Sequence, residues 1–159
     1  MNEKNLDRLW LDGNSVHYQS TPDWSWTLDL ADLLILGEYT NNDGPFLDDY
    51  FLVFVTRAGQ SYRASFYCEG RDEFVETFGT NFGVSIVFAL VGSTDFASSV
   101  LWPSELAGKP LYEFADVPPQ GKVGKALHWL RFGSKSITYS EVVSAAWRKR
   151  EIESGALQK

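Results

Sequence analysis

The stretch Tyr50-Phe51-Leu52-Val53-Phe54-Val55 decides the fold, because all six residues are aliphatic or aromatic. Successive side chains of a β-strand point to opposite faces of the sheet. A strand that is apolar at every position is therefore typical of the centre of a sheet that is covered on both faces. Ala58-Gly59 forms a turn, and residues 60–67 (QSYRASFY) then alternate between apolar and polar side chains. We expect a β-hairpin over 50–67 with a buried first strand.

The residues that precede this hairpin indicate four further strands. Asp12-Gly13-Asn14 separates the apolar stretches 9–11 and 16–18, and an Asp-Gly pair supplies the positive φ that a tight hairpin turn requires. Residues 24–28 (WSWTL) alternate between apolar and polar side chains, which is the period of a half-buried strand. Residues 33–36 (LLIL) predict a strand that ends at the turn cluster 41–45 (NNDGP).

The residues that follow the hairpin mix helical and extended patterns. Apolar residues at helical spacing and acidic residues in the first turn of 71–79 (RDEFVETFG) predict a short helix that ends near Gly79. Residues 85–91 (SIVFALV) are rich in β-branched side chains and predict a buried strand. Shorter strands are expected over 99–102 and around 111–114.

Two helices are expected near the C-terminus. Apolar residues at i, i+3, i+4 and i+7 predict the first helix over 123–133. Ser140 is suited to cap the second helix, and Gly155 is suited to close it.

Together these patterns predict one α+β domain. We expect an antiparallel sheet of six to eight strands, bent or partly closed, with a short inserted helix and helical C-terminal segments packed on an end or a face. The predicted core consists of Leu33, Ile35, Phe51, Val53, Val55, Phe66, Ile86, Phe88 and Leu90.

Charge divides the chain into two parts. Residues 1–116 carry 18 acidic and 6 basic side chains, whereas residues 117–159 carry 8 basic and 3 acidic ones, and the net charge is -7. We expect an acidic β-rich body and a basic helical C-terminal extension that packs on it within one structural domain. An acidic body repels nucleic acid and anionic membranes, whereas the basic extension attracts either of them or the body itself.

Composition also limits where the protein acts. Cys68 is the only cysteine, which excludes an intrachain disulfide and a zinc site built on thiolate pairs, and which fits a reducing compartment. The first ten residues lack the apolar stretch of a secretory signal, and the longest apolar run, residues 84–92, is shorter than the roughly 20 residues that span a bilayer. We expect a cytoplasmic protein without membrane insertion.

The sequence contains no pattern for catalysis, for a metal or for a cofactor. The glycine-rich patterns that bind phosphate are absent. Cys68 with His17 or His128 would make a nucleophile and its base, but a lone cysteine is more often a small buried hydrophobic residue. We therefore expect no cofactor and no metal, and we favour a protein that is not an enzyme.

Carboxylates and aromatic residues suggest a binding surface instead. The candidate residues are Glu38, Asp43, Asp48, Asp49, Trp24 and Tyr39. Acidic side chains accelerate association with a basic partner, and an exposed aromatic side chain anchors the complex. The leading hypothesis is a protein-interaction module for a basic protein partner, of inhibitor or immunity type. The alternative is that the acidic residues simply form a solvated turn.

Two other classes of function stay open. Trp24, Trp26 and Tyr39 would line the cleft of a small-ligand-binding domain. The basic triplet Arg148, Lys149 and Arg150 on the last helix would contact nucleic acid or an anionic membrane. Its competing interpretation is the solvated face of a helix that packs on the sheet. The sequence leaves the identity of any partner and the oligomeric state open.

The order of elements over residues 6–67 resembles the first half of bacterial PH-like domains. The resemblance is carried by a hairpin, a Trp-bearing strand, the strand Ala31 to Tyr39 and a further hairpin. It implies a scaffold for protein contacts. The first two loops carry Asp12 and Asp23 and no Lys or Arg, so the basic loop with which some PH domains bind phosphoinositides is missing.

Overall fold

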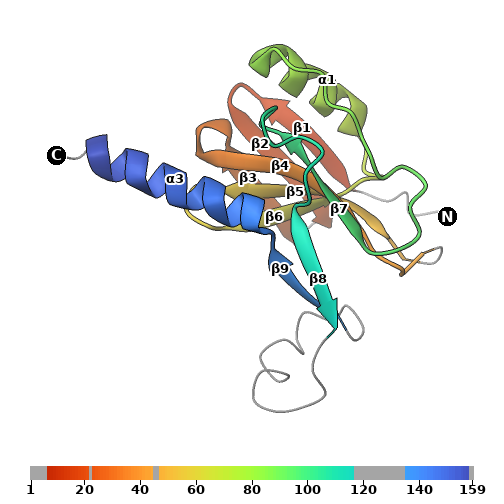
Figure 1. The fold of residues 1–159 in the computed structure, drawn as a ribbon. Coiled ribbons are helices and arrows are strands. Elements are labelled where there is room, and N and C mark those ends of the chain that lie inside the picture. Colours follow the sequence, from red (N-terminus) through yellow and green to blue (C-terminus); the bar gives the residue numbers. More distant parts are fainter. Residues whose placement is uncertain (1–6, 22, 45–46, 117–134, 158–159) are drawn as a thin grey trace.

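A four-stranded antiparallel sheet with the order β6-β5-β4-β7 lies at the centre of the protein (Figure 1). The computed structural model describes residues 7–21, 23–44, 47–116 and 135–157. The strands of this sheet are β4 (Leu33–Thr40), β5 (Tyr50–Thr56), β6 (Ser61–Ser65) and β7 (Ala97–Trp102). β5 lies between β4 and β6, so the fully apolar stretch occupies an interior strand as predicted.

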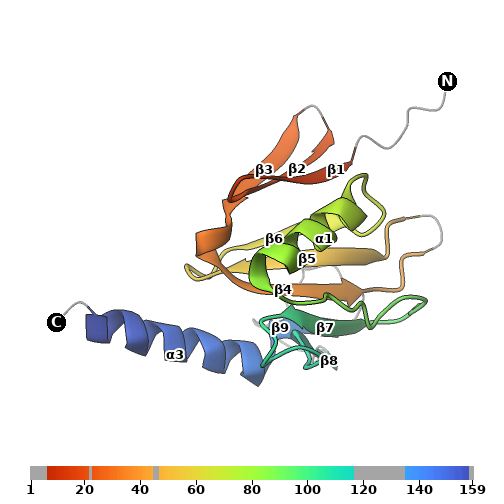
Figure 2. The same ribbon diagram turned by 90° about the horizontal axis from the view of Figure 1, so that it is seen from above.

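The remaining elements surround this sheet. A three-stranded antiparallel sheet packs on one face of the central sheet, and it is seen at the top of Figure 2. A two-stranded ribbon projects from the central sheet (Figure 1). α1 contributes to the core on one face of this sheet, and α3 contributes to the core on the other. These elements are β1 (Arg8–Asp12), β2 (Ser15–Thr21), β3 (Trp24–Asp29), the short 3-10 helix η1 (Leu30–Asp32), α1 (Arg71–Phe82), β8 (Tyr112–Asp116), β9 (Lys135–Tyr139) and α3 (Glu141–Leu157).

The two faces of the four-stranded sheet carry separate hydrophobic cores. Leu52 and Phe54 belong to the first core, and Val53 and Val55 belong to the second, as the alternation of side chains along a strand requires. The three-stranded sheet and α1 close the first core through Leu9, Val16, Tyr18, Trp26, Leu28, Phe74 and Phe78. α3 and the residues around β8 close the second core, mainly through Leu111, Val143 and the partly buried Trp147.

Side chains of the three-stranded sheet cover part of the free edge of β6. The hydroxyl of Tyr18 accepts the N–H of Ser65 at 3.1 Å and donates to Asp7 at 3.0 Å. The indole N–H of Trp26 donates to the carbonyl of Arg63 at 3.0 Å. An edge strand otherwise presents unpaired backbone groups to other chains. These bonds therefore join the two sheets and occupy backbone groups of β6 within the molecule.

The predicted α+β class and single domain are confirmed. The hairpins at 12–14 and 58–59, the strand that begins at Trp24, and the strand that ends before Pro103 all form. The strands divide among three sheets, and the described part of the chain contains nine of them rather than six to eight. Of the predicted core, Leu33, Ile35, Val53, Val55 and Phe66 are buried, whereas Phe51, Ile86, Phe88 and Leu90 are partly buried.

The prediction of a strand over 85–91 is wrong. These residues, all of which are described, belong to no strand, although side chains 84–90 alternate between half-buried and exposed positions as in extended chain. The predicted end of α1 near Gly79 is also wrong, because the helix continues to Phe82 and ends at Gly83 in the left-handed region (φ 65°). Gly79 instead lets the chain fold back, since a Cβ there would meet the carbonyl oxygen of Val84 at 2.5 Å.

The C-terminal predictions divide into three outcomes. The helix expected over 123–133 lies outside the described residues. Ser140 caps α3 as predicted, because its hydroxyl accepts the N–H of Val143 at 3.4 Å. The expected end at Gly155 is wrong, since α3 continues to Leu157. The indole N–H of Trp147 donates to the carbonyl of Thr56 at 3.1 Å and ties α3 to the end of β5.

Candidate binding sites

Three of the four predicted carboxylates lie on the loop between β4 and β5. Asp43 is exposed and forms a local turn with Asn41, whereas Asp48 and Asp49 are half-buried. The hydroxyl of Tyr67 donates to Asp49 at 2.9 Å. Burial and this bond to a carboxylate raise the pKa of the Tyr67 hydroxyl. We name Asp43, Leu47, Asp48, Asp49 and Tyr67 the acidic loop surface.

Glu38 does not belong to this surface, which corrects the sequence prediction. Its side chain is completely buried between β4 and the segment that follows α1. The carboxylate accepts the N–H of Ala89 at 2.7 Å and the hydroxyl of Tyr50. Burial raises the pKa of Glu38, and its hydrogen bonds oppose that rise. Glu38 therefore holds the segment around Ala89 against the sheet.

The aromatic residues predicted to line a cleft do not meet. Trp26 lies in the first core, Tyr39 lies in the second, and the four-stranded sheet separates them. Tyr39 is buried, and its hydroxyl accepts from the guanidinium of Arg63 at 3.0 Å. Trp24 is 48% exposed and lies edge-on to Tyr18, so among these three it is the one available to a partner.

The candidate nucleophile lacks an activating environment. Burial raises the pKa of the Cys68 thiol to about 12, so the thiol stays protonated at neutral pH. The Nδ1 atom of His17 lies 3.0 Å from the hydroxyl of Thr27, and its ring stacks on Trp10. His128 lies outside the described residues. Among the residues that the structure describes, no group of three or more His, Cys, Asp and Glu side chains is placed to hold a metal ion.

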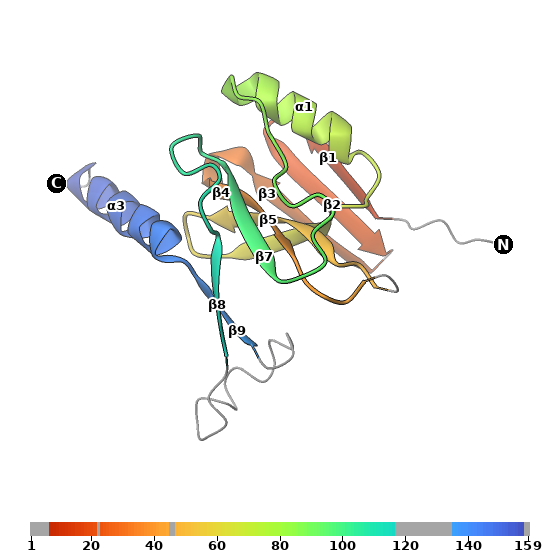
Figure 3. The same ribbon diagram turned by 45° about the vertical axis from the view of Figure 1, so that its right-hand side comes forward.

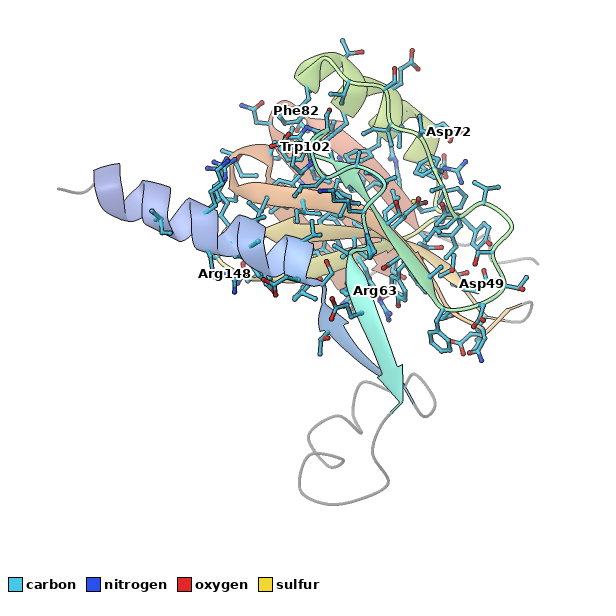
Figure 4. The ribbon with its side chains drawn as sticks, in the orientation of Figure 1. Asp49, Arg63, Asp72, Phe82, Trp102 and Arg148 are labelled. Atoms are coloured by element: carbon cyan, nitrogen blue, oxygen red, sulfur yellow. The ribbon has the colours of Figure 1, made fainter. Side chains whose placement is uncertain are left out.

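A groove of about 830 Å³ lies between α3, the turn that follows β7 and the C-terminal end of α1. Its apolar lining residues include Leu34, Phe82, Val84, Trp102, Leu106 and Val142. The rings of Phe82 and Trp102 contact each other with their centroids 4.8 Å apart, as Figure 4 shows near the end of α1. We name this feature the α3 groove.

The α3 groove exists because α3 meets the sheet with one face and turns an adjacent face outward. Val143 and Trp147 pack into the second core. Val142, Ala145 and Ala146 line the groove instead, and the two alanines leave room beside the helix. In the sequence, Val142, Val143, Ala146 and Trp147 follow one helical spacing, and spacing alone does not separate two adjacent helix faces.

The rim of the α3 groove carries an excess of positive charge. Lys109, Lys149 and Arg150 contribute three cations, and Glu105 and Glu141 contribute two carboxylates. Glu141 already forms an ion pair with the guanidinium of Arg148. An anionic group that approaches the groove therefore meets cations whose charge Glu105 offsets only in part.

The basic triplet is divided by this geometry. Lys149 and Arg150 line the α3 groove, whereas Arg148 pairs with Glu141 along the helix surface. All three side chains are exposed. The triplet therefore contributes two residues to the groove. Figure 4 shows Arg148 and Asp49 at opposite ends of the molecule, so the basic triplet and the acidic loop surface lie on different parts of it.

Sequence reasoning missed the body's side of the α3 groove. Trp102, Leu106 and Lys109 come from β7 and the turn after it, and they meet α3 only through the fold. No pattern in the sequence indicated which helix would pack beside these residues.

Comparisons with protein-family models, with curated proteins and with solved structures find no match for this chain. Within the described residues, neither helix has the length and the apolar character needed to cross a membrane.

Proposed function

We propose that the protein is a non-enzymatic protein-interaction module and that the α3 groove binds an apolar, acidic segment of a partner protein. The observation that carries this proposal is the combination of an apolar floor, which includes Phe82 and Trp102, with an excess of cations on the rim. A volume of about 830 Å³ lies within the range of roughly 300–1,000 Å³ typical of ligand sites.

The two parts of the groove have different roles in this proposal. Apolar side chains of the partner segment lose water against Trp102 and Leu106, and this burial provides most of the affinity. The exposed cations Lys149 and Arg150 attract carboxylates, which raises the association rate and selects acidic sequences more than it adds affinity.

The first test uses anilinonaphthalene sulfonate, an apolar anion whose fluorescence reports binding. We expect the protein to bind this probe and Ala146→Trp to abolish binding, because the indole occupies the groove. Lys149→Gln and Arg150→Gln should each weaken binding about two- to fivefold, as expected for an exposed charge. Arg148→Gln is the matched control, since Arg148 belongs to the same triplet but does not line the groove.

The second test identifies the source of the apolar anion. Peptides selected from a random library against the immobilised protein should be rich in apolar and acidic residues and should lose binding to Ala146→Trp. Selected peptides that bind Ala146→Trp as well as they bind the wild type would contradict the proposal. A groove that binds the probe but no peptide would instead support a small-ligand-binding domain.

The acidic loop surface supports a second candidate, a site for a basic protein partner. Leu47 is 68% exposed and directly precedes Asp48 in the chain. Tyr67 is 56% exposed, and its hydroxyl donates a hydrogen bond to Asp49. This is the leading sequence hypothesis without Glu38, Trp24 and Tyr39, and it agrees with the scaffold role that the PH-like pattern implies. Asp48→Asn and Asp49→Asn should slow association with a basic partner at low salt, and unchanged association rates would remove this candidate.

Contact with nucleic acid or an anionic membrane through α3 is the third hypothesis. The cations Arg148, Lys149 and Arg150 are followed on the same helix by Glu151 and Glu153, and Glu141 precedes them, so the helix as a whole carries no net charge. Filter binding to DNA and sedimentation with anionic vesicles at low salt test this hypothesis, which requires a steep loss of binding as salt rises. A cytoplasmic location, favoured by the single cysteine, also stays a proposal.

A further inference from the structure

A second hollow meets the α3 groove at Val84. It has a volume of about 510 Å³ and is formed by α1 and the first residues of the segment that follows α1. Val84 lines both this hollow and the α3 groove, so the two features are continuous at one apolar residue. We name this feature the α1 hollow, and its lining includes Asp72, Glu76, Thr80, Val84, Ser85 and Ile86.

The α1 hollow and the α3 groove carry opposite charges. The charged side chains among the described residues that line the α1 hollow are Asp72 and Glu76, and both are exposed. Asp72 pairs with Arg71, whereas Glu76 has no ion-pair partner among the described residues. The α3 groove has the reverse, an excess of cations that includes Lys149 and Arg150. A ligand that occupies both features therefore meets cations in one and carboxylates in the other.

The backbone at the α1 hollow is suited to a peptide. Val84 donates its N–H to the carbonyl of Gly79 at 2.9 Å. The N–H and C=O groups of the next two residues, Ser85 and Ile86, form no hydrogen bond with any other described residue. Ser85 is exposed and Ile86 packs against the first core, as side chains of an extended chain alternate. Unpaired backbone groups on an extended segment can bond to the backbone of another extended chain.

We propose that the partner segment bound in the α3 groove continues past Val84 into the α1 hollow and carries a basic residue there. This inference rests on the proposed function of the α3 groove and adds a second charge requirement to it. The segment is acidic where it meets Lys149 and Arg150. It is apolar over Val84 and basic beside Glu76. Opposite charges in the two features fix the direction in which the segment lies.

Charge selects a basic residue at this end of the segment. A carboxylate in the α1 hollow would lie near Asp72 and Glu76 and would be repelled by both. A lysine or arginine is attracted by the same two groups, and the net charge of -7 of the whole chain adds to this attraction. A segment that is acidic along its whole length therefore ends at Val84, whereas one with a basic end can use both features.

Helix geometry sets the spacing of the basic residue. Val84 contacts α1 at Gly79, and Glu76 precedes Gly79 by three residues. Three residues advance an α-helix by about 4.5 Å, and Asp72 lies about one turn further along. An extended chain rises by about 3.3 Å per residue. We therefore expect the lysine or arginine about two or three residues beyond the apolar residue that covers Val84.

Short labelled peptides test this inference by fluorescence anisotropy. Both contain two glutamates and four apolar residues in sequence, and the far end carries two lysines in one peptide and two glutamines in the other. Each is made in both chain directions. The lysine peptide should bind the wild type about two- to fivefold more tightly than the glutamine peptide, as expected for an exposed charge. Glu76→Gln should remove this preference, and Glu76→Lys should reverse it.

Glu73→Lys is the matched control for Glu76→Lys. Glu73 is exposed on the same helix but does not line the α1 hollow, so its replacement should retain the preference for the lysine peptide. Thermal unfolding shows that both variants are folded. A preference that Glu73→Lys and Glu76→Lys change equally would show a general effect of charge and would overturn the inference.

The outcomes separate this inference from the proposed function. Peptides that lose binding to Ala146→Trp but bind Glu76→Lys with an unchanged lysine preference, or show none in the wild type, would overturn only the extension into the α1 hollow. Peptides that bind Ala146→Trp as well as the wild type would contradict the proposed function itself. A groove that binds anilinonaphthalene sulfonate but neither peptide would overturn the inference and favour a small ligand.

Discussion

On one face of the four-stranded sheet, Leu52 and Phe54 point into a core that a second sheet and α1 close, whereas on the other face Val53 and Val55 meet mainly α3 and the residues around β8. The first face is rich in aromatic contacts, among them Trp26 with Phe54 at 5.0 Å between ring centroids. The second face also has aromatic contacts, but Phe51, Tyr112, Tyr139 and Trp147 are only partly buried there. Its only helix among the described residues is α3, which lies to one side of the sheet in Figure 3.

This difference separates stability from binding. A sheet packed on a sheet and a helix buries large side chains on every side. On the second face, α3 leaves one of its own sides uncovered, and the α3 groove lies along that side of the helix. We infer that the first face supplies most of the stability and that the second face tolerates the open surface that binding requires.

The largest effect is expected from Phe54→Ala in the first core. Phe54 is completely buried and contacts Trp26 and Phe74. Removal of the ring should lower the free energy of unfolding by about 3–5 kcal/mol, from lost burial and from the cavity that remains. Urea denaturation measures this change. A loss no greater than that of Val143→Ala would contradict the division between the faces.

A smaller effect is expected from Val143→Ala in the second core. Val143 is completely buried where α3 meets the sheet. Its truncation should cost about 1–3 kcal/mol. It should also accelerate hydrogen exchange in α3 more than in β5, because α3 can detach while the first core stays closed. Equal acceleration in both elements would show that the two cores unfold as one unit.

Trp147→Phe should have a still smaller effect. The substitution retains an aromatic ring against Tyr139 but removes the hydrogen bond from the indole N–H to the carbonyl of Thr56. One such bond contributes about 1 kcal/mol. Thermal unfolding measures the loss, and Arg148→Gln, at the adjacent exposed position, is expected to change stability by less than about 0.5 kcal/mol.

For Glu38→Gln, the informative quantity is how the free energy of unfolding depends on pH, and not how large the change in that free energy is. Burial raises the folded pKa of Glu38 above its ordinary value of 4.5, so the folded protein binds this proton more tightly than the unfolded chain does. The resulting stability is complete below pH 4.5 and is lost as the pH rises through the folded pKa. Glu38→Gln should therefore show a weaker decline of stability over this interval in urea titrations at several pH values.

Tyr50→Phe is the matching control for this prediction. The hydrogen bond from the Tyr50 hydroxyl lowers the pKa of Glu38, so its removal should extend the decline of stability to higher pH. A pH dependence that is identical in Glu38→Gln and in the wild type would show that Glu38 does not titrate in this way.

Much of the local structure could be predicted from the sequence. The apolar stretch 50–55 predicted an interior strand, Asp12-Gly13 predicted a hairpin, and Ser140 predicted a helix start, and all three are confirmed. These features depend on side-chain period and on backbone preferences of a few adjacent residues. The strand predicted over 85–91 did not form, because a strand also needs a partner that the segment itself cannot supply.

The candidate sites were less predictable. Asp43, Asp48 and Asp49 lie on one loop as their positions in the sequence suggest, but Glu38 is buried because residues far along the chain cover it. Trp26 and Tyr39 separate because a sheet lies between them. Burial of a given side chain depends on which element crosses it, and that information is not local.

The sequence by itself determined the α+β class, the interior position of β5 and the capped start of α3, because each follows from periodicity or from the chemistry of a turn. Only the tertiary structure decided that α3 lies beside the turn after β7, with Lys149 and Arg150 at the rim of an apolar groove. The physical reason is that helical spacing limits which residues share a face, whereas the element that packs against that face is selected by the shape of the whole sheet.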